Sequence, residues 1–175
     1  MAMGQADFAD LRVMLVGSKT HMLSLVRSVL AIVGINRVCQ VEKPDRALEM
    51  LRLEHFGAIF CEELTVDGGM AFTVAVRRAP AVLEPLIPIF VLHDRARRRD
   101  VETARDLGAT DVLTVPISPR TISTKLRAAL KSPRPFVLAA GFFGPDRRAR
   151  GRTVFAGKER RTRVPRRARV NLTLE

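Results

Sequence analysis

The sequence has few of the residues that would define a disulfide-stabilised or metal-binding protein. Its two cysteines, Cys39 and Cys61, give no disulfide framework and fit a reducing compartment. The three histidines, His21, His55 and His93, have no metal-ligand spacing with one another or with the cysteines. No metal site is therefore predicted.

Long apolar runs are also missing. No segment approaches the roughly 20 apolar residues that a membrane-spanning helix needs, so no membrane span is expected. The first ten residues carry acids and no positively charged n-region, which predicts the absence of a secretory signal. A cytoplasmic location is the resulting expectation.

Positive charge is concentrated in the last quarter of the chain. Residues 131–175 contain 13 Lys/Arg and 3 Asp/Glu, a net charge of +10, whereas residues 1–130 contain 17 and 15, a net charge of +2. A nearly neutral body with a cationic arm favours an anionic partner: a nucleotide, a nucleic acid, a membrane surface or an acidic protein. A solvated tail that serves solubility is the alternative interpretation.

Before this arm, short apolar runs alternate with segments of helical periodicity. Pro44 and Pro119 stand at expected helix starts and Ser118 at an N-cap, while Gly34 and Gly108 follow expected helix ends. The pattern predicts five strands, at 11–16, 37–41, 58–61, 88–92 and 111–115, and five helices, at 22–33, 44–51, 71–78, 97–107 and 119–130.

Strands that alternate with helices indicate an α/β protein with a parallel sheet covered on both faces. The right-handed crossover rule favours a flavodoxin-like, doubly wound, five-stranded sheet in the order 2-1-3-4-5. In this order a ligand would lie at the carboxyl ends of strands one, three and four. The basic C-terminal tail is expected to be largely irregular.

Residues 10–131 resemble a receiver domain, the phospho-accepting module of two-component signalling. The resemblance is carried by the first strand (12–16), the Asp67-Gly68 loop, the segment 107–111 (Leu-Gly-Ala-Thr-Asp) and the segment 113–116 (Leu-Thr-Val-Pro). It implies an acidic pair after strand one, an aspartate after strand three, a hydroxyl residue after strand four and a lysine after strand five. These are the residues of phosphoryl transfer in that family.

This chain fills those positions differently, with Gly17 and Ser18, then Glu62, His93 and Val115. Magnesium prefers several hard oxygen ligands, and two carboxylates are missing. A glutamate is one methylene longer than aspartate and displaces its carboxylate from in-line attack, while valine cannot neutralise a transferring phosphoryl group. We therefore predict no phosphorylation, no magnesium site and no catalytic residue.

Glu62 itself has two interpretations. It is either a built-in mimic of the phosphorylated state or a polar residue tolerated at the end of a strand. A mimic needs a bistable element to act on, and the partner residues of such an element are replaced here, which favours the second interpretation.

The tail, residues 132–175, begins with a proline-containing linker at 132–135 and then carries a duplicated motif. Segments 142–150 and 155–163 both read Phe-x-Gly-x-acid-Arg-Arg-x-Arg. Arginine forks pair with phosphate or with a guanine edge, and phenylalanine offers a stacking face. Two equal units are typical of a site for a planar, anionic ligand with two equal halves.

The motif resembles the arginine-rich tails of bacterial receiver-like proteins that bind cyclic di-GMP. In that group the receiver body contacts a protein partner, for example a flagellar or chemotaxis component. The resemblance implies that one set of residues binds the nucleotide: Phe142, Asp146, Arg147, Arg148, Arg150, Phe155, Glu159, Arg160, Arg161 and Arg163.

The leading hypothesis is a non-enzymatic signalling adaptor with a receiver-like domain at 1–131, no tightly bound cofactor and a nucleotide-binding tail. A second hypothesis is a nucleic-acid- or ribosome-associated protein that uses the tail as a cationic arm and binds mainly without sequence specificity. In a third, the phenylalanines of the tail pack against a neighbouring protein and the tail is structural.

Overall fold

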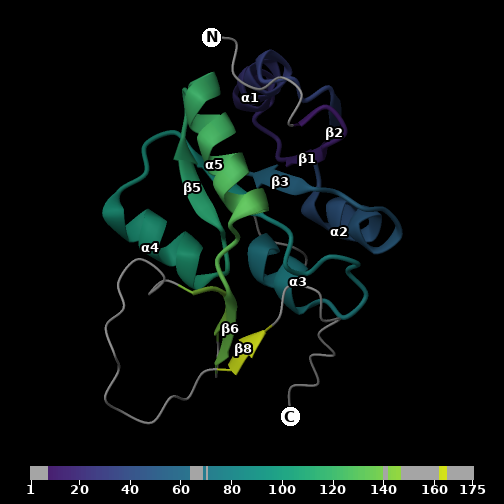
Figure 1. Cartoon of the computed structure of the whole chain (residues 1–175), viewed down its shortest axis with the longest axis vertical. Helices are drawn as coiled ribbons and strands as arrows, with labels where there is room; N and C mark the ends of the chain where they lie inside the picture. The colour runs from purple at the N-terminus through teal and green to yellow at the C-terminus, as the bar shows by residue number, and fades with distance from the viewer. Residues whose placement is uncertain (1–7, 64–68, 70, 140–141, 147–161, 165–175) are drawn as a thin grey trace.

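A computed structural model of the chain describes residues 8–63, 69, 71–139, 142–146 and 162–164. The body is a five-stranded parallel sheet in the order β2-β1-β3-β4-β5 with helices around it (Figure 1), which confirms the predicted order. The strands are β1 (Arg12–Val16), β2 (Arg37–Val41), β3 (Ala58–Cys61), β4 (Ile89–His93) and β5 (Asp111–Thr114).

Local sequence signals set the ends of the helices. The Ser118 hydroxyl accepts a hydrogen bond from the Thr121 amide at 3.1 Å where the last helix starts. Gly34 and Gly108 follow helix ends with φ of 91° and 93°, a region that favours glycine. The described helices are α1 (Thr20–Ile32), α2 (Pro44–Leu53), α3 (Phe72–Arg78), α4 (Arg98–Asp106) and α5 (Pro119–Lys131).

Apolar side chains cover both faces of the sheet. β3 is buried at every position and β1 at every position except Arg12, as expected for central strands of a parallel sheet. α1 and α5 pack on one face, where the rings of Phe60 and Phe90 stack with centroids 4.9 Å apart. α2, α3 and α4 pack on the other face, around Ile59. In the part of the chain that the structure describes, no helix is long and apolar enough to cross a membrane.

A second, antiparallel sheet follows α5, in the order β7-β6-β8. Figure 1 shows β6 and β8 beyond the end of α5, on the side of α3 and α4. These strands add ordered elements to a segment that the sequence predicts to be largely irregular. The domain boundary after residue 131 stays a prediction. The strands are β6 (Phe136–Ala139), β7 (Phe142–Pro145) and β8 (Thr162–Val164).

A buried arginine at the end of α3 lies between the body and the hairpin of β6 and β7. Arg77 is only 1% exposed. Its Nε donates to the Gly108 carbonyl at 3.0 Å, and its Nη1 donates to the carbonyls of Pro85 and Ile87 at 2.6 and 2.7 Å. The guanidinium carbon lies 5.0 Å from the centroid of the Phe136 ring, which is within the range of a cation–π contact.

Two glycines allow β7 to approach the turn between α4 and β5. A Cβ on Gly108 would lie 2.8 Å from the Phe143 carbonyl oxygen, and a Cβ on Gly144 would lie 2.9 Å from the Gly108 Cα. Both distances are shorter than normal van der Waals contact, so the close approach requires glycine at both positions. We call Arg77, Gly108, Phe136 and Gly144 the Arg77 joint. It attaches the hairpin directly to the body, where the sequence predicts a largely irregular tail.

Candidate functional site

The five positions that the receiver resemblance singles out lie at one edge of the parallel sheet. Gly17 and Ser18 follow β1, Glu62 follows β3, His93 ends β4 and Val115 follows β5. Because parallel strands all end at the same edge, the fold brings these positions together, and each can be compared with the role that the family gives it.

Glu62 is turned inward beneath the end of β1. It is 6% exposed, and its Oε1 accepts a hydrogen bond from the Lys19 amide at 2.7 Å. Its own amide donates to the Val16 carbonyl at 3.0 Å. A Cβ on Gly17 would lie 2.5 Å from the Glu62 carboxyl carbon, so the carboxylate fills the space that a side chain at Gly17 would need. The glutamate and the glycine are therefore sterically matched.

The environment of Glu62 offers little to a divalent cation. Ser18, like Gly17, contributes no carboxylate, and the Lys19 amide occupies one oxygen of Glu62. Within the described residues, no group of three His, Cys, Asp or Glu side chains is arranged to hold a metal ion. The neighbouring acid Glu63 is exposed, and Asp67 lies outside the described residues. The absence of a magnesium site stays a prediction.

His93 is bound to the loop that follows it. Its Nδ1 accepts a hydrogen bond from the Arg95 amide at 3.1 Å, and its Nε2 lies 3.8 Å from an Asp100 oxygen. The same Asp100 carboxylate accepts the Arg97 amide at 2.8 Å, and this bond is the main cause that lowers the pKa of Asp100, with Arg99 and His93 contributing. An imidazole held by its own loop replaces the hydroxyl that would follow a phosphoryl group.

Val115 packs against the core under α1 and α5. Its amide donates to the His93 carbonyl at 3.0 Å. Lys19, which lies on the same edge, has an exposed side chain whose Nζ is 3.5 Å from an Asp94 oxygen. An apolar side chain thus stands where phosphoryl chemistry would need a positive charge.

The structure describes three of the predicted nucleotide-binding residues. Phe142 begins β7 and is half-buried, and Asp146 follows β7 with its amide donating to the Pro135 carbonyl at 2.7 Å. Arg163 lies in β8, where its backbone pairs with Val137 of β6. The others lie outside the described residues: Arg147, Arg148, Arg150, Phe155, Glu159, Arg160 and Arg161.

The phenylalanines of the tail divide into two groups. Phe136 and Phe143 are 6% and 4% exposed and pack against each other with ring centroids 5.8 Å apart. They bury the hairpin against this chain's own body instead of a neighbouring protein. Phe142 is the one described tail phenylalanine that is not fully buried.

Sequence analysis missed the buried Arg77. Arg77 and Arg78 end α3, and only the helical period distinguishes them in the sequence. Arg77 lies four residues after Thr73 and hence on the same face of the helix, the face that the structure shows to be buried. Burial lowers the pKa of Arg77 to about 9, which leaves it cationic at neutral pH, while burial raises the pKa of the nearby Cys61 thiol to about 12.

The fold is that of response-regulator receiver domains. The receiver domain of a sensor histidine kinase from Pseudomonas aeruginosa PAO1, solved with magnesium in its active-site cleft, matches 70% of this chain and 98% of its own length at 22% identity and a TM-score of 0.59. A response regulator from Desulfuromonas acetoxidans matches 69% of this chain and 97% of its own length at 23% identity and a TM-score of 0.60.

The chemotaxis response regulator CheY4 of Vibrio cholerae matches 69% of this chain and 98% of its own length at 22% identity and a TM-score of 0.55. No protein-family model and no curated protein sequence matches the chain. The solved domains are covered almost completely by about seven tenths of this chain, so they have no counterpart to the remainder.

Proposed function

We propose that the chain is a non-enzymatic signalling adaptor of the two-component type that acts by contact with a protein partner and without phosphoryl transfer. One observation carries the proposal. The Glu62 carboxylate is buried under Gly17 and hydrogen-bonded to the Lys19 amide. The carboxylate at the phospho-accepting position therefore accepts a backbone hydrogen bond inside the protein and does not face a ligand.

The neighbouring positions support the same conclusion. In-line phosphoryl transfer depends on a positioned acceptor, a metal ion and cationic stabilisation of the transferring group. Gly17 and Ser18 supply no carboxylate, His93 is bound to its own loop and Val115 is apolar. Without phosphoryl transfer, the part of such a fold that can still act is its surface. Receiver domains act on other proteins through their surfaces.

The phosphorylation test uses radiolabelled acetyl phosphate with magnesium. We expect the full chain to remain unlabelled, and we expect Glu62→Asp to remain unlabelled as well, because shortening the acid restores neither the metal carboxylates nor the lysine. An active receiver domain in the same reaction is the positive control. Stable label on Glu62 of the unmodified chain contradicts the proposal.

We further propose that the tail binds cyclic di-GMP. The duplicated motif supplies two equal sets of arginine, acid and phenylalanine residues. In the described part of the tail, β7 from the first copy and β8 from the second copy flank the same strand, β6. Gly144 and Arg163 both pair with Val137, one on each side. The fold therefore brings parts of both copies of the motif to one small sheet, which supports binding of a ligand with two equal halves.

Calorimetry with cyclic di-GMP tests the tail. Arg147→Gln with Arg148→Gln is expected to weaken binding by about a hundredfold, since each charge-assisted hydrogen bond contributes roughly 1.5 kcal/mol or more. Arg95→Gln with Arg99→Gln removes the same charge from two exposed residues of the body, one in the loop after β4 and one in the first turn of α4, and should leave the affinity unchanged. If the full chain gives no heat of binding with cyclic di-GMP, the proposal that the tail binds this nucleotide is wrong.

The charge of the tail supports a second candidate, a protein that binds nucleic acid without sequence specificity. Residues 131–175 carry a net charge of +10, and such an arm binds phosphate backbones with steep salt dependence. Under this alternative, Asp146→Asn with Glu159→Gln leaves binding unchanged or slightly stronger. Under the dinucleotide proposal the same pair of substitutions weakens binding to cyclic di-GMP.

A further inference from the structure

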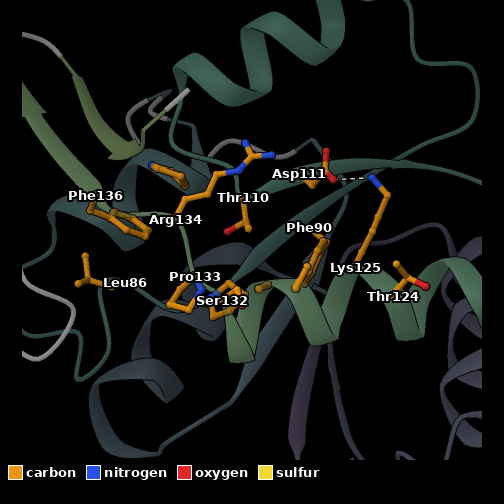
Figure 2. Close-up of a pocket in the computed structure, with 14 residues that line it drawn as sticks. Leu86, Phe90, Thr110, Asp111, Thr124, Lys125, Ser132, Pro133, Arg134 and Phe136 are labelled. Atoms are coloured by element: carbon orange, nitrogen blue, oxygen red, sulfur yellow. Dashed lines mark hydrogen bonds and ion pairs between the residues drawn. The ribbon is translucent and has the colours of Figure 1, made fainter. Parts of the chain in front are cut away.

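A cavity with a volume of about 370 Å³ lies at the end of the molecule opposite Glu62. It opens between the last turns of α5, the starts of β4 and β5, and the hairpin of β6 and β7. Figure 2 shows that Ser132, Pro133 and Arg134, where the chain leaves α5, form one side of the opening. The cavity therefore exists because the hairpin packs back on the body. Its volume is within the range of small-molecule sites in proteins.

The inner walls of the cavity are apolar. Phe90 from β4 and Phe136 from β6 contribute aromatic rings, and the buried side chains of Leu86 and Ala129 also line the cavity. Phe90 and Phe136 are 1% and 6% exposed, so packing holds both rings in place. Rigid aromatic and aliphatic walls favour a ligand with an apolar, planar body.

The rim of the cavity carries two cations, Lys125 and Arg134, and only Lys125 is paired with a described residue. Lys125 is paired with Asp111 at one side of the cavity, as the dashed line in Figure 2 shows. Burial raises the pKa of Asp111, but its bond to Lys125 and the nearby cations outweigh burial, so the pKa lies below its ordinary value and the pair is charged at neutral pH. Arg134 extends over the opening and has no hydrogen bond or ion pair with any described residue.

We infer that this cavity binds a small aromatic carboxylate, with the apolar body between Phe90 and Phe136 and the anionic group on Arg134. A guanidinium binds a carboxylate through two parallel hydrogen bonds, which fixes the orientation of the ligand. The hydroxyls of Thr124 and Ser132 lie on the same rim and offer further polar contacts. The inference does not depend on the proposed function, because the cavity shares no residue with the edge that carries Glu62.

Calorimetry of the full chain with naphthalene-2-carboxylate tests the inference, with naphthalene-2-carboxamide as the uncharged comparison. We expect saturable binding of the carboxylate with a Kd below about 1 mM, and binding of the amide weaker by about tenfold, since it lacks the charge-assisted bonds. Arg134→Gln should weaken carboxylate binding by about tenfold and bring the two ligands to similar affinity.

Two further variants fix the location. Ala129→Leu enlarges a buried side chain of α5 that lines the cavity and should abolish binding of both ligands, whereas Arg120→Gln removes an exposed cation from the same helix outside the cavity and should change neither. If Ala129→Leu does not fold, the comparison of Arg134→Gln with Arg120→Gln decides. Absence of saturable binding to the full chain, equal binding of carboxylate and amide, or unchanged binding by Arg134→Gln overturns the inference.

Discussion

Replacing Arg77 by methionine is expected to lower the free energy of unfolding by about 3 kcal/mol, although methionine is apolar and similar in length. The substitution leaves three carbonyls without their donor, those of Gly108, Pro85 and Ile87. Each buried acceptor without a partner costs about 1 kcal/mol or more. Relief from burying a charge offsets part of this loss, but three unpaired carbonyls outweigh it.

Urea unfolding at neutral pH measures the effect, and Arg78→Met is the matched control. Arg78 is the next residue of α3, and it is partly exposed with no hydrogen bond or ion pair among the described residues. Its substitution should change the free energy of unfolding by less than about 0.5 kcal/mol. Arg77→Lys should also be destabilising, because one ammonium lacks the fork that reaches several carbonyls. Equal stability of the two methionine variants would show that Arg77 does not stabilise the fold.

Gly108→Ala is expected to cost about 3 kcal/mol, against about 1 kcal/mol for Gly69→Ala, and to detach the hairpin from the body. Both glycines have positive φ, 93° and 78°, so both alanines carry the same kind of backbone strain. They differ in their surroundings. A Cβ at Gly108 would lie 2.8 Å from the Phe143 carbonyl oxygen and 3.0 Å from the Arg77 Cγ, while a Cβ at Gly69 meets nothing within 4 Å. The remaining difference, about 2 kcal/mol, is overpacking.

Unfolding measurements give the stabilities, and hydrogen exchange of the β6 and β7 amides reports on the hairpin. Gly108→Ala should increase exchange in the hairpin, and Gly69→Ala should leave it unchanged. Similar stability and exchange for the two variants would mean that the hairpin adapts to the extra methyl group. The close approach described at Gly144 would then not be needed for docking.

Most of the body could be predicted because its signals are local. Ser118 and Pro119 mark the start of α5 through a cap and a fixed φ, and both act within four residues. Apolar runs such as Ala58–Cys61 identify buried strands, and chain handedness then leaves few possible strand orders. The strand order predicted the carboxyl edge of the sheet as the place for a ligand, and the resemblance to a receiver domain singled out Glu62 there.

The details of the site could not be predicted because they depend on contacts between distant residues. The hydrogen bond from Lys19 to Glu62 spans 43 positions in the sequence, and the bond from Arg77 to Gly108 spans 31. The hairpin of β6 and β7 lies in a tail that the sequence predicts to be largely irregular, and its close approach to the body depends on Gly108 and Gly144, which are 36 residues apart. Arg77 and Arg78 are neighbours in α3, and which of them is buried depends on which face of the helix packs against the body.

The fit between Glu62 and Gly17 also limits which substitutions this edge of the sheet can accept. An acid introduced at position 17 alone would place its first side-chain carbon 2.5 Å from the Glu62 carboxyl carbon. The new side chain can be accommodated only if the glutamate is shortened or moved as well. The two positions can therefore change only together, and a single substitution at position 17 carries a steric cost.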